Sequence, residues 1–241
     1  MHGLSSPDRT VADGGGGAPV WDYAIVGRGT AGAEIESRLS ETPSTRVVLL
    51  EAGRDLVPGR LPSDIASVFP LATFNDRYVW PELRAHWRTE ANSPALPFQQ
   101  GRILGGSGSV MGMWALRGMP EDYDGWAAAG AAGWGWADVL PFFRRIETDC
   151  DFAGPLHGTD GPIPIRRQQP GDWSPLASAV HTAAGKLGFA EIDDMNADFR
   201  DGHCALPISR YQDSRASGAI CYLTADVRRR PNLLVVTDTT V

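Results

Sequence analysis

Three glycines and one glutamate near the start of the chain have the spacing of a dinucleotide-binding site. Gly27, Gly29 and Gly32 form the pattern G-x-G-x-x-G, and Glu51 follows nineteen residues after Gly32. In this pattern the first glycine permits a tight turn, the second admits a pyrophosphate, and the third lets a helix pack on a strand. A carboxylate at the later position accepts hydrogen bonds from ribose hydroxyls. It would repel a 2′-phosphate, which disfavours NADP.

A strand–helix–strand unit must position these residues. Residues 21–26 predict a short apolar strand, residues 33–41 a helix, and residues 46–50 a second strand that leads into Glu51. The helix N-terminus would offer free N–H groups and a partial positive charge to phosphates. A glycine-rich turn without a ligand is the alternative, because the chain has 28 glycines. The complete unit favours the nucleotide site, and it does not by itself distinguish FAD from NAD.

A second glycine-rich segment, residues 105–109 with the sequence GGSGS, could also face phosphate or ring oxygens with its backbone N–H groups. Its composition alone fits a surface loop equally well. Residues 54–100 are rich in proline, tryptophan and polar residues and predict long ordered loops with short helical turns. A loop of that length is usually functional or covers a ligand.

The remaining pattern alternates helices with strands, which indicates an α/β or mixed α+β fold. Residues 161–165 carry two prolines and predict at most an edge strand. Ser174 is a predicted N-cap, and Gly188 a predicted C-cap, of one helix. The predicted helices cover 120–126, 136–147, 174–187 and 217–227, and the last predicted strand covers 232–237.

Composition excludes several classes of protein. The net charge is −7 and no basic block is present, which argues against nucleic acid as the main partner. No apolar run approaches the roughly 20 residues of a membrane span, and residues 1–20 predict a flexible tail without the apolar core of a secretion signal. Cys150, Cys204 and Cys221 lack C-x-x-C spacing, so we expect reduced thiols, no metal site and a cytoplasmic location.

Several longer motifs occur in a characteristic order. They are DYAIVGRGTAG from Asp22, VLLEAG from Val48, GRILGGS from Gly101, RG at Arg117, DYDGW from Asp122 and GWGW from Gly133, with weaker matches GPIPI, DMN, RAS and RPNL from Gly161, Asp194, Arg215 and Arg230. In these motifs the chain from Trp21 onward resembles the N-terminal part of the glucose–methanol–choline (GMC) family of FAD-dependent oxidoreductases. The pairing of the two glycine-rich segments indicates a flavin rather than a nicotinamide.

The resemblance implies a Rossmann-like FAD-binding βαβ domain of discontinuous segments, joined to part of a substrate-domain insertion. After the tail at 1–20, it implies an FAD-binding core with flavin-covering loops over 21–125, an insertion over 126–205, and a return to the FAD-binding domain over 206–241. The cofactor-binding residues that it implies are Gly27, Gly29, Thr30, Ala31, Gly32, Glu51, Ala52, Arg102, Gly105, Gly106, Ser107, Val110, Met111 and Val241.

The chain departs from the family pattern at two positions in this set. Met111 stands where the family usually has an asparagine. Val110 stands where some members attach FAD through a histidine, so we expect a non-covalent, dissociable FAD. The family's C-terminal half, which carries its catalytic histidine, would follow Val241. No catalytic residue is therefore assigned, and the 241-residue chain alone is expected to be inactive and, with strand 47–50 uncovered, prone to association.

The histidines do not match the family's catalytic position. We expect them to be structural or solvated, although His86 and His203 could approach a cofactor; the tryptophans at 134 and 136 predict packing. The resemblance implies oxidation of CH–OH groups of a small alcohol by hydride transfer to FAD. A truncated, non-catalytic flavin- or nucleotide-binding module and an NAD-dependent dehydrogenase are the alternatives. The particular alcohol, the choice between oxidase and dehydrogenase, and the oligomeric state stay open.

Overall fold

The computed structural model describes residues 19–241, so nearly all of the predicted tail, with His2, lies outside the described residues. The chain divides into two compact units. Among the described residues, the first contains 19–62, Leu71–Met111 and Gly218–Val241, and the second contains Ser63–Pro70 and Gly112–Ser217. Residues 112–125 fall in the second unit, where Ala115 N–H donates to the Pro207 carbonyl at 3.0 Å.

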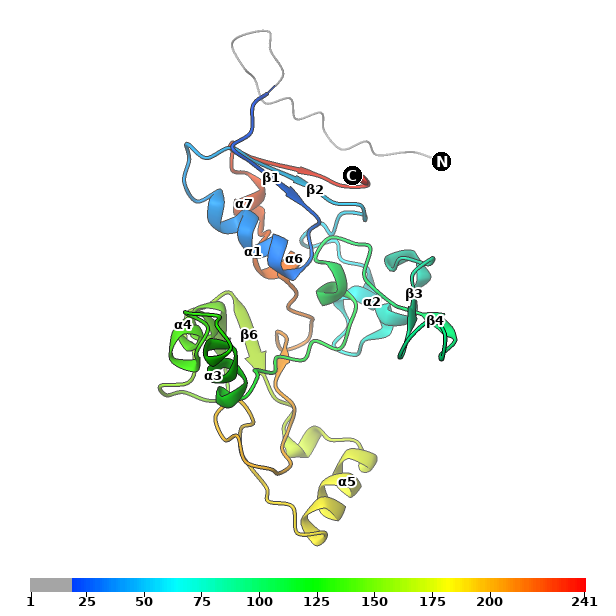
Figure 1. The fold of residues 1–241 in the computed structure, drawn as a ribbon, viewed down its shortest axis with the longest axis vertical. Coiled ribbons are helices and arrows are strands. Elements are labelled where there is room, and N and C mark those ends of the chain that lie inside the picture. The colour runs from blue at the N-terminus through cyan, green and yellow to red at the C-terminus, as the bar shows by residue number, and fades with distance from the viewer. Residues whose placement is uncertain (1–18) are drawn as a thin grey trace. The chain divides into compact units, whose positions relative to one another are not determined.

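The first unit is built on a parallel three-stranded sheet in the order β1 (Tyr23–Val26), β2 (Val47–Leu50), β8 (Leu233–Val236). Helix α1 (Thr30–Leu39) connects β1 to β2 and completes the predicted strand–helix–strand unit. Figure 1 shows α1, with α6 (Gly218–Cys221) beside it, on one side of this sheet.

The expectation that strand 47–50 lies uncovered is wrong. β2 is hydrogen-bonded to β1 on one side and to β8 on the other, and Val47 and Leu49 are fully buried. β8 returns from the far end of the sequence to cover the second side. The exposed strand is β1 instead, where Tyr23 and Val26 are 50% and 63% exposed.

The helix predicted over 217–227 is two short helices, α6 and α7 (Ala225–Arg228). The side chain of Thr224 accepts a hydrogen bond from Val227 N–H at 3.4 Å, so it caps a new helix rather than continuing the first one. Arg228 at the end of α7 forms a two-pronged ion pair with Asp55 at 2.7 and 2.9 Å.

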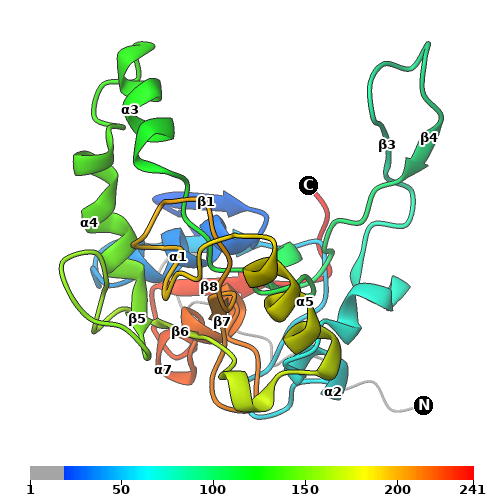
Figure 2. The same ribbon diagram turned by 90° about the horizontal axis from the view of Figure 1, so that it is seen from below.

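The segment after β2 is made of loops and short turns, as predicted. It includes the 3₁₀ turns η1 (Leu71–Phe74) and η2 (Asp76–Tyr78) and the antiparallel pair β3 (Arg84–His86) and β4 (Ala95–Pro97). Figure 2 shows the β3–β4 hairpin as a long arm. A further 3₁₀ turn, η3 (Gly106–Ser109), forms within the GGSGS segment.

The second unit combines helices with a small mixed sheet. Its helices are α2 (Ser63–Ala66), α3 (Pro120–Ala128), α4 (Trp136–Ile146) and α5 (Pro175–Lys186), its 3₁₀ turn is η4 (Pro170–Asp172), and its strands are β5 (Glu147–Asp149), β6 (Ile163–Arg166) and β7 (Ile208–Ser209). The predicted caps of α5 are present: Ser174 Oγ accepts from Ala177 N–H at 3.1 Å, and Gly188 has φ +86°.

The edge-strand prediction for 161–165 is wrong, because β6 is the central strand, parallel to β5 and antiparallel to β7. A proline is tolerated there because the β6–β7 pairing covers only Ile165 and Arg166. The Pro164 carbonyl points toward β7 and accepts a hydrogen bond from Arg210 N–H at 3.0 Å. The N and the C=O of one strand residue point to the same side, so the N–H that Pro164 lacks would lie just beyond the paired residues of β6 and β7.

Trp136 has the packing role expected from sequence. Its ring lies 5.8 Å from that of Tyr123, 6.2 Å from Phe143 and 5.6 Å from Phe199. The three cysteines are free thiols. No helix among the described residues is long and apolar enough to cross a membrane.

Candidate dinucleotide site

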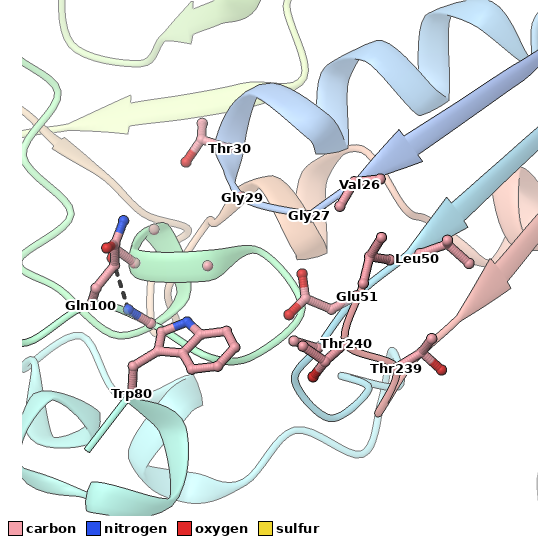
Figure 3. Close-up of a pocket in the computed structure, with 16 residues that line it drawn as sticks. Val26, Gly27, Gly29, Thr30, Leu50, Glu51, Trp80, Gln100, Thr239 and Thr240 are labelled. Carbon is pink, nitrogen blue, oxygen red and sulfur yellow. Dashed lines mark hydrogen bonds between the residues drawn. The ribbon is translucent and has the colours of Figure 1, made fainter. Parts of the chain in front are cut away.

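A pocket of about 480 Å³ opens in the first unit at the carboxyl ends of β1 and β2, where open α/β sheets bind ligands. Figure 3 shows Val26 and Leu50, the last residues of these strands, on one wall and Trp80 and Gln100 on another. The residues that line the pocket are Val26, Gly27, Gly29, Thr30, Leu50, Glu51, Ala52, Trp80, Gln100, Gly101, Gly106, Ser107, Gly108, Thr239, Thr240 and Val241.

The turn between β1 and α1 has the geometry of a phosphate cradle. Gly27 has φ +84°, which residues with a side chain rarely adopt. Gly29 is the N-cap of α1, and a Cβ placed on it would meet no atom within 4 Å. That space is therefore open for a ligand. A Cβ on Gly32 would lie 2.3 Å from the Gly27 carbonyl oxygen, so the helix packs against the turn at this point.

Glu51 ties the second strand to this turn. Its carboxylate is buried; one oxygen accepts from Arg28 N–H at 2.7 Å and the other from Gly53 N–H at 2.6 Å. A carboxylate has about four acceptor positions. Two acceptor positions remain after both backbone bonds are made.

A buried ion pair lies next to the turn. Arg28 Nε donates to Glu36 Oε1 at 2.5 Å, and both residues have no exposed surface. Burial lowers the pKa of Arg28 and raises the pKa of Glu36, and their mutual hydrogen bond opposes both shifts. The sequence interpretation did not include this pair.

The second glycine-rich segment lies directly against the first. Gly105 N–H donates to the Arg28 carbonyl at 2.7 Å. Gly106 has φ +56°, and a Cβ on it would lie 2.9 Å from Gly29 Cα. Two segments almost eighty residues apart in the sequence thus form one continuous backbone surface around the pocket.

Comparison with known proteins identifies this arrangement. The GMC oxidoreductase family profile matches residues 13–241. The chain belongs to the GMC oxidoreductase family. It comprises that family's N-terminal FAD-binding part.

Among individual GMC relatives, the chain is 41% identical over 231 residues to 5-(hydroxymethyl)furfural oxidase of Methylovorus sp. (strain MP688), which covers 92% of this chain and 43% of the relative. It is 34% identical over 250 residues to mitochondrial choline dehydrogenase of Mus musculus, and the match covers 100% of this chain and 41% of the relative. The crystal structure of pyridoxine 4-oxidase from Mesorbium loti superimposes with a TM-score of 0.78 at 32% identity. The match covers 91% of this chain and 42% of the oxidase chain. The chain therefore spans about two fifths of the length of these relatives.

The structure gathers eight of the residues that the GMC resemblance implied. Those that line the pocket are Gly27, Gly29, Thr30, Glu51, Ala52, Gly106, Ser107 and Val241. The others do not line it: Ala31, Gly32, Arg102, Gly105, Val110 and Met111. Val110 is fully buried, whereas Arg102 is exposed and its guanidinium lies over the ring of Trp80.

The other eight lining residues were not in the implied set. Four of them, Val26, Leu50, Gly101 and Gly108, belong to or adjoin the predicted strands and glycine-rich segments. The sequence interpretation missed the other four, Trp80, Gln100, Thr239 and Thr240, because none belongs to a local glycine or acid pattern. Thr239 and Thr240 follow β8, and the pairing of β8 with β2 carries them to the end of the sheet where Glu51 lies. Only that pairing could have indicated them.

None of the described histidines lines the pocket, including His86 and His203. His157 is buried in the second unit, where its Nε2 lies 2.9 Å from Asp194 and its Nδ1 lies 3.4 and 3.3 Å from Glu147 and Asp149. Of the two expected environments, structural or solvated, the structure shows the structural one: His157 is buried among three carboxylates.

Two arginines complete this ion network. Arg117 contacts Glu147 at 2.5 Å, and Arg167 contacts Asp149 and Asp194 at 2.9 and 2.6 Å. Burial lowers the pKa of Arg167, but the two aspartates outweigh burial and raise the pKa above its ordinary value. Glu147, Asp149 and His157 are close enough together to hold a metal ion. Two of these three residues, Glu147 and Asp149, are the ones that Arg117 and Arg167 contact.

Proposed function

We propose that the native protein carrying this chain is an FAD-dependent oxidoreductase that oxidises CH–OH groups of small alcohols, and that this chain supplies the ADP-binding half of its flavin site. The observation that carries the proposal is the pocket in which Gly29, Gly106 and Glu51 face one another. GMC membership supports the choice of FAD over NAD.

The pocket residues suit an ADP moiety. The open space beside Gly29 lies at the N-terminus of the ten-residue helix α1, where free N–H groups and the helix dipole favour a pyrophosphate. Glu51 has acceptor positions left for ribose hydroxyls. The Gly106–Gly108 backbone lines the same pocket and would face the part of the cofactor that joins the pyrophosphate to the flavin.

When bound, FAD supplies the hydride acceptor. The residues of this chain would bind and orient it: the glycine turn admits the pyrophosphate, and Glu51 fixes the ribose. A base near the substrate hydroxyl is also needed. Since no histidine of this chain matches the position of the family's catalytic histidine, we propose that residues 1–241 alone do not oxidise alcohols.

The relatives guide the choice of substrates to test. Their names specify 5-(hydroxymethyl)furfural, pyridoxine and choline. All three are alcohols, which supports a small alcohol as the substrate class. The native protein, loaded with FAD and kept anaerobic, should lose flavin absorbance with at least one of them. Tight binding of NAD without binding of FAD would overturn the proposal.

The same preparation tests the mode of attachment. Val110 carries no nucleophile and is fully buried. We therefore propose that the FAD is held without a covalent bond. Acid precipitation should leave the yellow colour in the supernatant, and flavin retained in the washed pellet would contradict this.

The non-catalytic module is the second candidate function. The observation that favours it is that no histidine of the chain matches the position of the family's catalytic histidine. The candidates separate in one experiment: a native protein that binds FAD stoichiometrically but shows no bleaching with any alcohol in the panel would support the binding module.

A further inference from the structure

The two ring nitrogens of His157, in the second unit, have different surroundings. The side chain of this histidine is 4% exposed. Its Nε2 lies 2.9 Å from Asp194 Oδ2. Its Nδ1 lies 3.4 Å from Glu147 Oε1 and 3.3 Å from Asp149 Oδ2, and it has no hydrogen-bond partner among the described residues. A buried nitrogen therefore faces two carboxylates without a hydrogen bond to either.

The fold brings these side chains together from two segments. Glu147 and Asp149 are alternate residues of β5, so they point to the same face of the strand. The loop that carries His157 is bonded to that strand, because Asp149 N–H donates to the Gly158 carbonyl at 2.9 Å. A Cβ on Gly158 would overlap the Arg144 carbonyl oxygen, so only glycine lets the loop approach this closely. One side-chain atom from each of Glu147, Asp149 and His157 lies within 4.8 Å of the other two.

The contact with Asp194 decides which nitrogen of His157 holds the proton. A proton on Nε2 is attracted to the Asp194 carboxylate, and the lone pair then lies on Nδ1. That lone pair is repelled by the two carboxylate oxygens that it faces unless a positive charge lies between them. A second proton on Nδ1 would supply such a charge. However, the separations of 3.3 and 3.4 Å are longer than the roughly 2.7–3.2 Å of an N–H···O hydrogen bond.

A zinc ion fits these separations better than a proton does. Zinc binds nitrogen and oxygen ligands at about 2.1 Å in a tetrahedron, which places neighbouring ligand atoms about 3.4 Å apart. An octahedral ion with bonds of the same length would bring neighbouring ligand atoms to about 3.0 Å. The observed 3.4 and 3.3 Å from Nδ1 match the tetrahedral value.

The charges around His157 also favour a divalent cation. Four carboxylates contact two arginines: Arg117 lies 2.5 Å from Glu147, and Arg167 lies 2.9, 3.6 and 2.6 Å from Asp149, Asp151 and Asp194. With every carboxylate ionised and His157 neutral, two negative charges remain. Buried charges are normally paired or bound to a metal, and one Zn²⁺ would cancel the remainder.

The surrounding groups have the arrangement of a second ligand shell. Metal-binding histidines usually donate their other N–H to a carboxylate, and metal-binding carboxylates are themselves hydrogen-bonded. Asp194 is placed for the first of these contacts, and Arg117 and Arg167 make the second. A pocket of about 340 Å³, lined in part by His157 and Asp194, opens beside the cluster. It offers a path for the ion and for a water molecule as the fourth ligand.

We propose that Glu147, Asp149 and His157 bind a zinc ion through Oε1, Oδ2 and Nδ1. The ion would connect β5 to the loop that carries His157 and would stabilise the second unit. All three ligands lie in the second unit, so this inference goes beyond the proposed function and does not depend on it.

The first test measures zinc in the native protein, purified without chelators. Inductively coupled plasma mass spectrometry should find one zinc ion per chain. Removal of the ion with EDTA should lower the melting temperature, and added Zn²⁺ should restore it, because a ligand that binds only the folded state stabilises that state. The FAD content is measured in the same samples. Loss of zinc with normal FAD, or the reverse, separates this inference from the proposed function.

The second test locates the ion by calorimetric titration of Zn²⁺ into the EDTA-treated protein. We expect His157→Gln to abolish the binding and Asp194→Asn to raise the Kd roughly 10- to 100-fold, the usual effect of losing a partner of a metal ligand. His181→Gln is the matched control and should bind zinc like the wild type. His181 is a half-buried histidine of the same unit, and its Nε2 lies 3.6 Å from Glu191.

The opposite results would overturn the inference. A wild-type protein that contains no zinc and takes up none would show that a proton, not a metal, lies between Nδ1 and the carboxylates. Binding of Mg²⁺ in preference to Zn²⁺ would contradict the tetrahedral site. If His157→Gln does not fold, Asp194→Asn decides, because an unchanged Kd there would place the zinc elsewhere. An equal loss in His181→Gln would do the same.

Discussion

The pocket of the first unit and the ion network of the second unit use polar groups in opposite ways. The pocket is built mainly from backbone at Gly27, Gly29 and Gly106, and its buried carboxylate, Glu51, is held by two N–H groups. The network is built from side chains: three carboxylates, two arginines and His157, all buried together or nearly so.

Because of this difference, we expect changes in the pocket to alter ligand binding and changes in the network to alter folding stability. The pocket leaves open space and unused acceptor positions, so a change there should affect the ligand more than the fold. In the network, each arginine is paired with buried carboxylates. Removing one partner leaves an uncompensated buried charge, which costs far more than the pair contributes. A change there should affect the fold of the second unit and leave dinucleotide binding nearly intact.

The largest effect on binding is expected for Gly29→Val. The new side chain would occupy the open space beside α1, where a Cβ meets no protein atom within 4 Å. The protein should therefore fold and lose FAD entirely, as measured by flavin absorbance after gel filtration. Gly171→Val is the control, because Gly171 is also unobstructed but lies in the second unit. Stoichiometric FAD in Gly29→Val would show that this turn is not the phosphate cradle.

The largest effect on stability is expected for Arg167→Met. It leaves Asp149 and Asp194 without their arginine partner, and we expect a loss of about 3–5 kcal/mol in the free energy of unfolding. Urea unfolding of the native protein measures it. Arg200→Met, which removes an exposed pair with Asp198, should leave the free energy of unfolding nearly unchanged, because solvent screens exposed pairs. Equal losses in the two variants would mean that burial does not distinguish the pairs.

A smaller effect on binding is expected for Glu51→Ala. It removes charge-assisted hydrogen bonds to the ribose, each worth about 1.5–3 kcal/mol, and it frees Arg28 N–H and Gly53 N–H. Calorimetry should show weaker FAD binding by a few kcal/mol at most. Glu41→Ala, at an exposed pair with Arg38, is the control. An unchanged Kd in a protein that binds FAD would refute the ribose assignment.

The smallest expected effect is a dependence of the free energy of unfolding on pH, caused by Tyr222 in the first unit. Burial raises the pKa of Tyr222 well above its ordinary value. The folded state therefore keeps the Tyr222 proton above pH 10, where the unfolded chain releases it. The resulting stability is complete below pH 10 and is lost as the pH rises further, by at most about 1.4 kcal/mol per pH unit. Tyr222→Phe should flatten this decline in urea unfolding, whereas Tyr23→Phe, at an exposed position, should not. If the free energy of unfolding falls equally with rising pH in Tyr222→Phe and in the wild type, Tyr222 is not the cause of the decline.

Local patterns were enough to predict the opening unit and its ligand class. Gly27, Gly29, Gly32 and Glu51 lie within thirty residues of one another, and their spacing reflects one turn, one helix and one strand. The caps of α5 were predictable for the same reason, because Ser174 and Gly188 act on the backbone immediately beside them.

Only the tertiary structure decided which distant residues complete the site. β8 pairs with β2 and brings Thr239 and Thr240 to the pocket. The backbone N–H of Trp80 donates to the Gln100 carbonyl at 3.0 Å, and these two residues form another wall of the pocket. The same holds for β6, which became a central strand when β7 paired with it, and for His157, whose three acidic neighbours come from two separate segments. These contacts depend on chain segments meeting across long separations, and no periodicity or spacing within one segment encodes where its partner will lie.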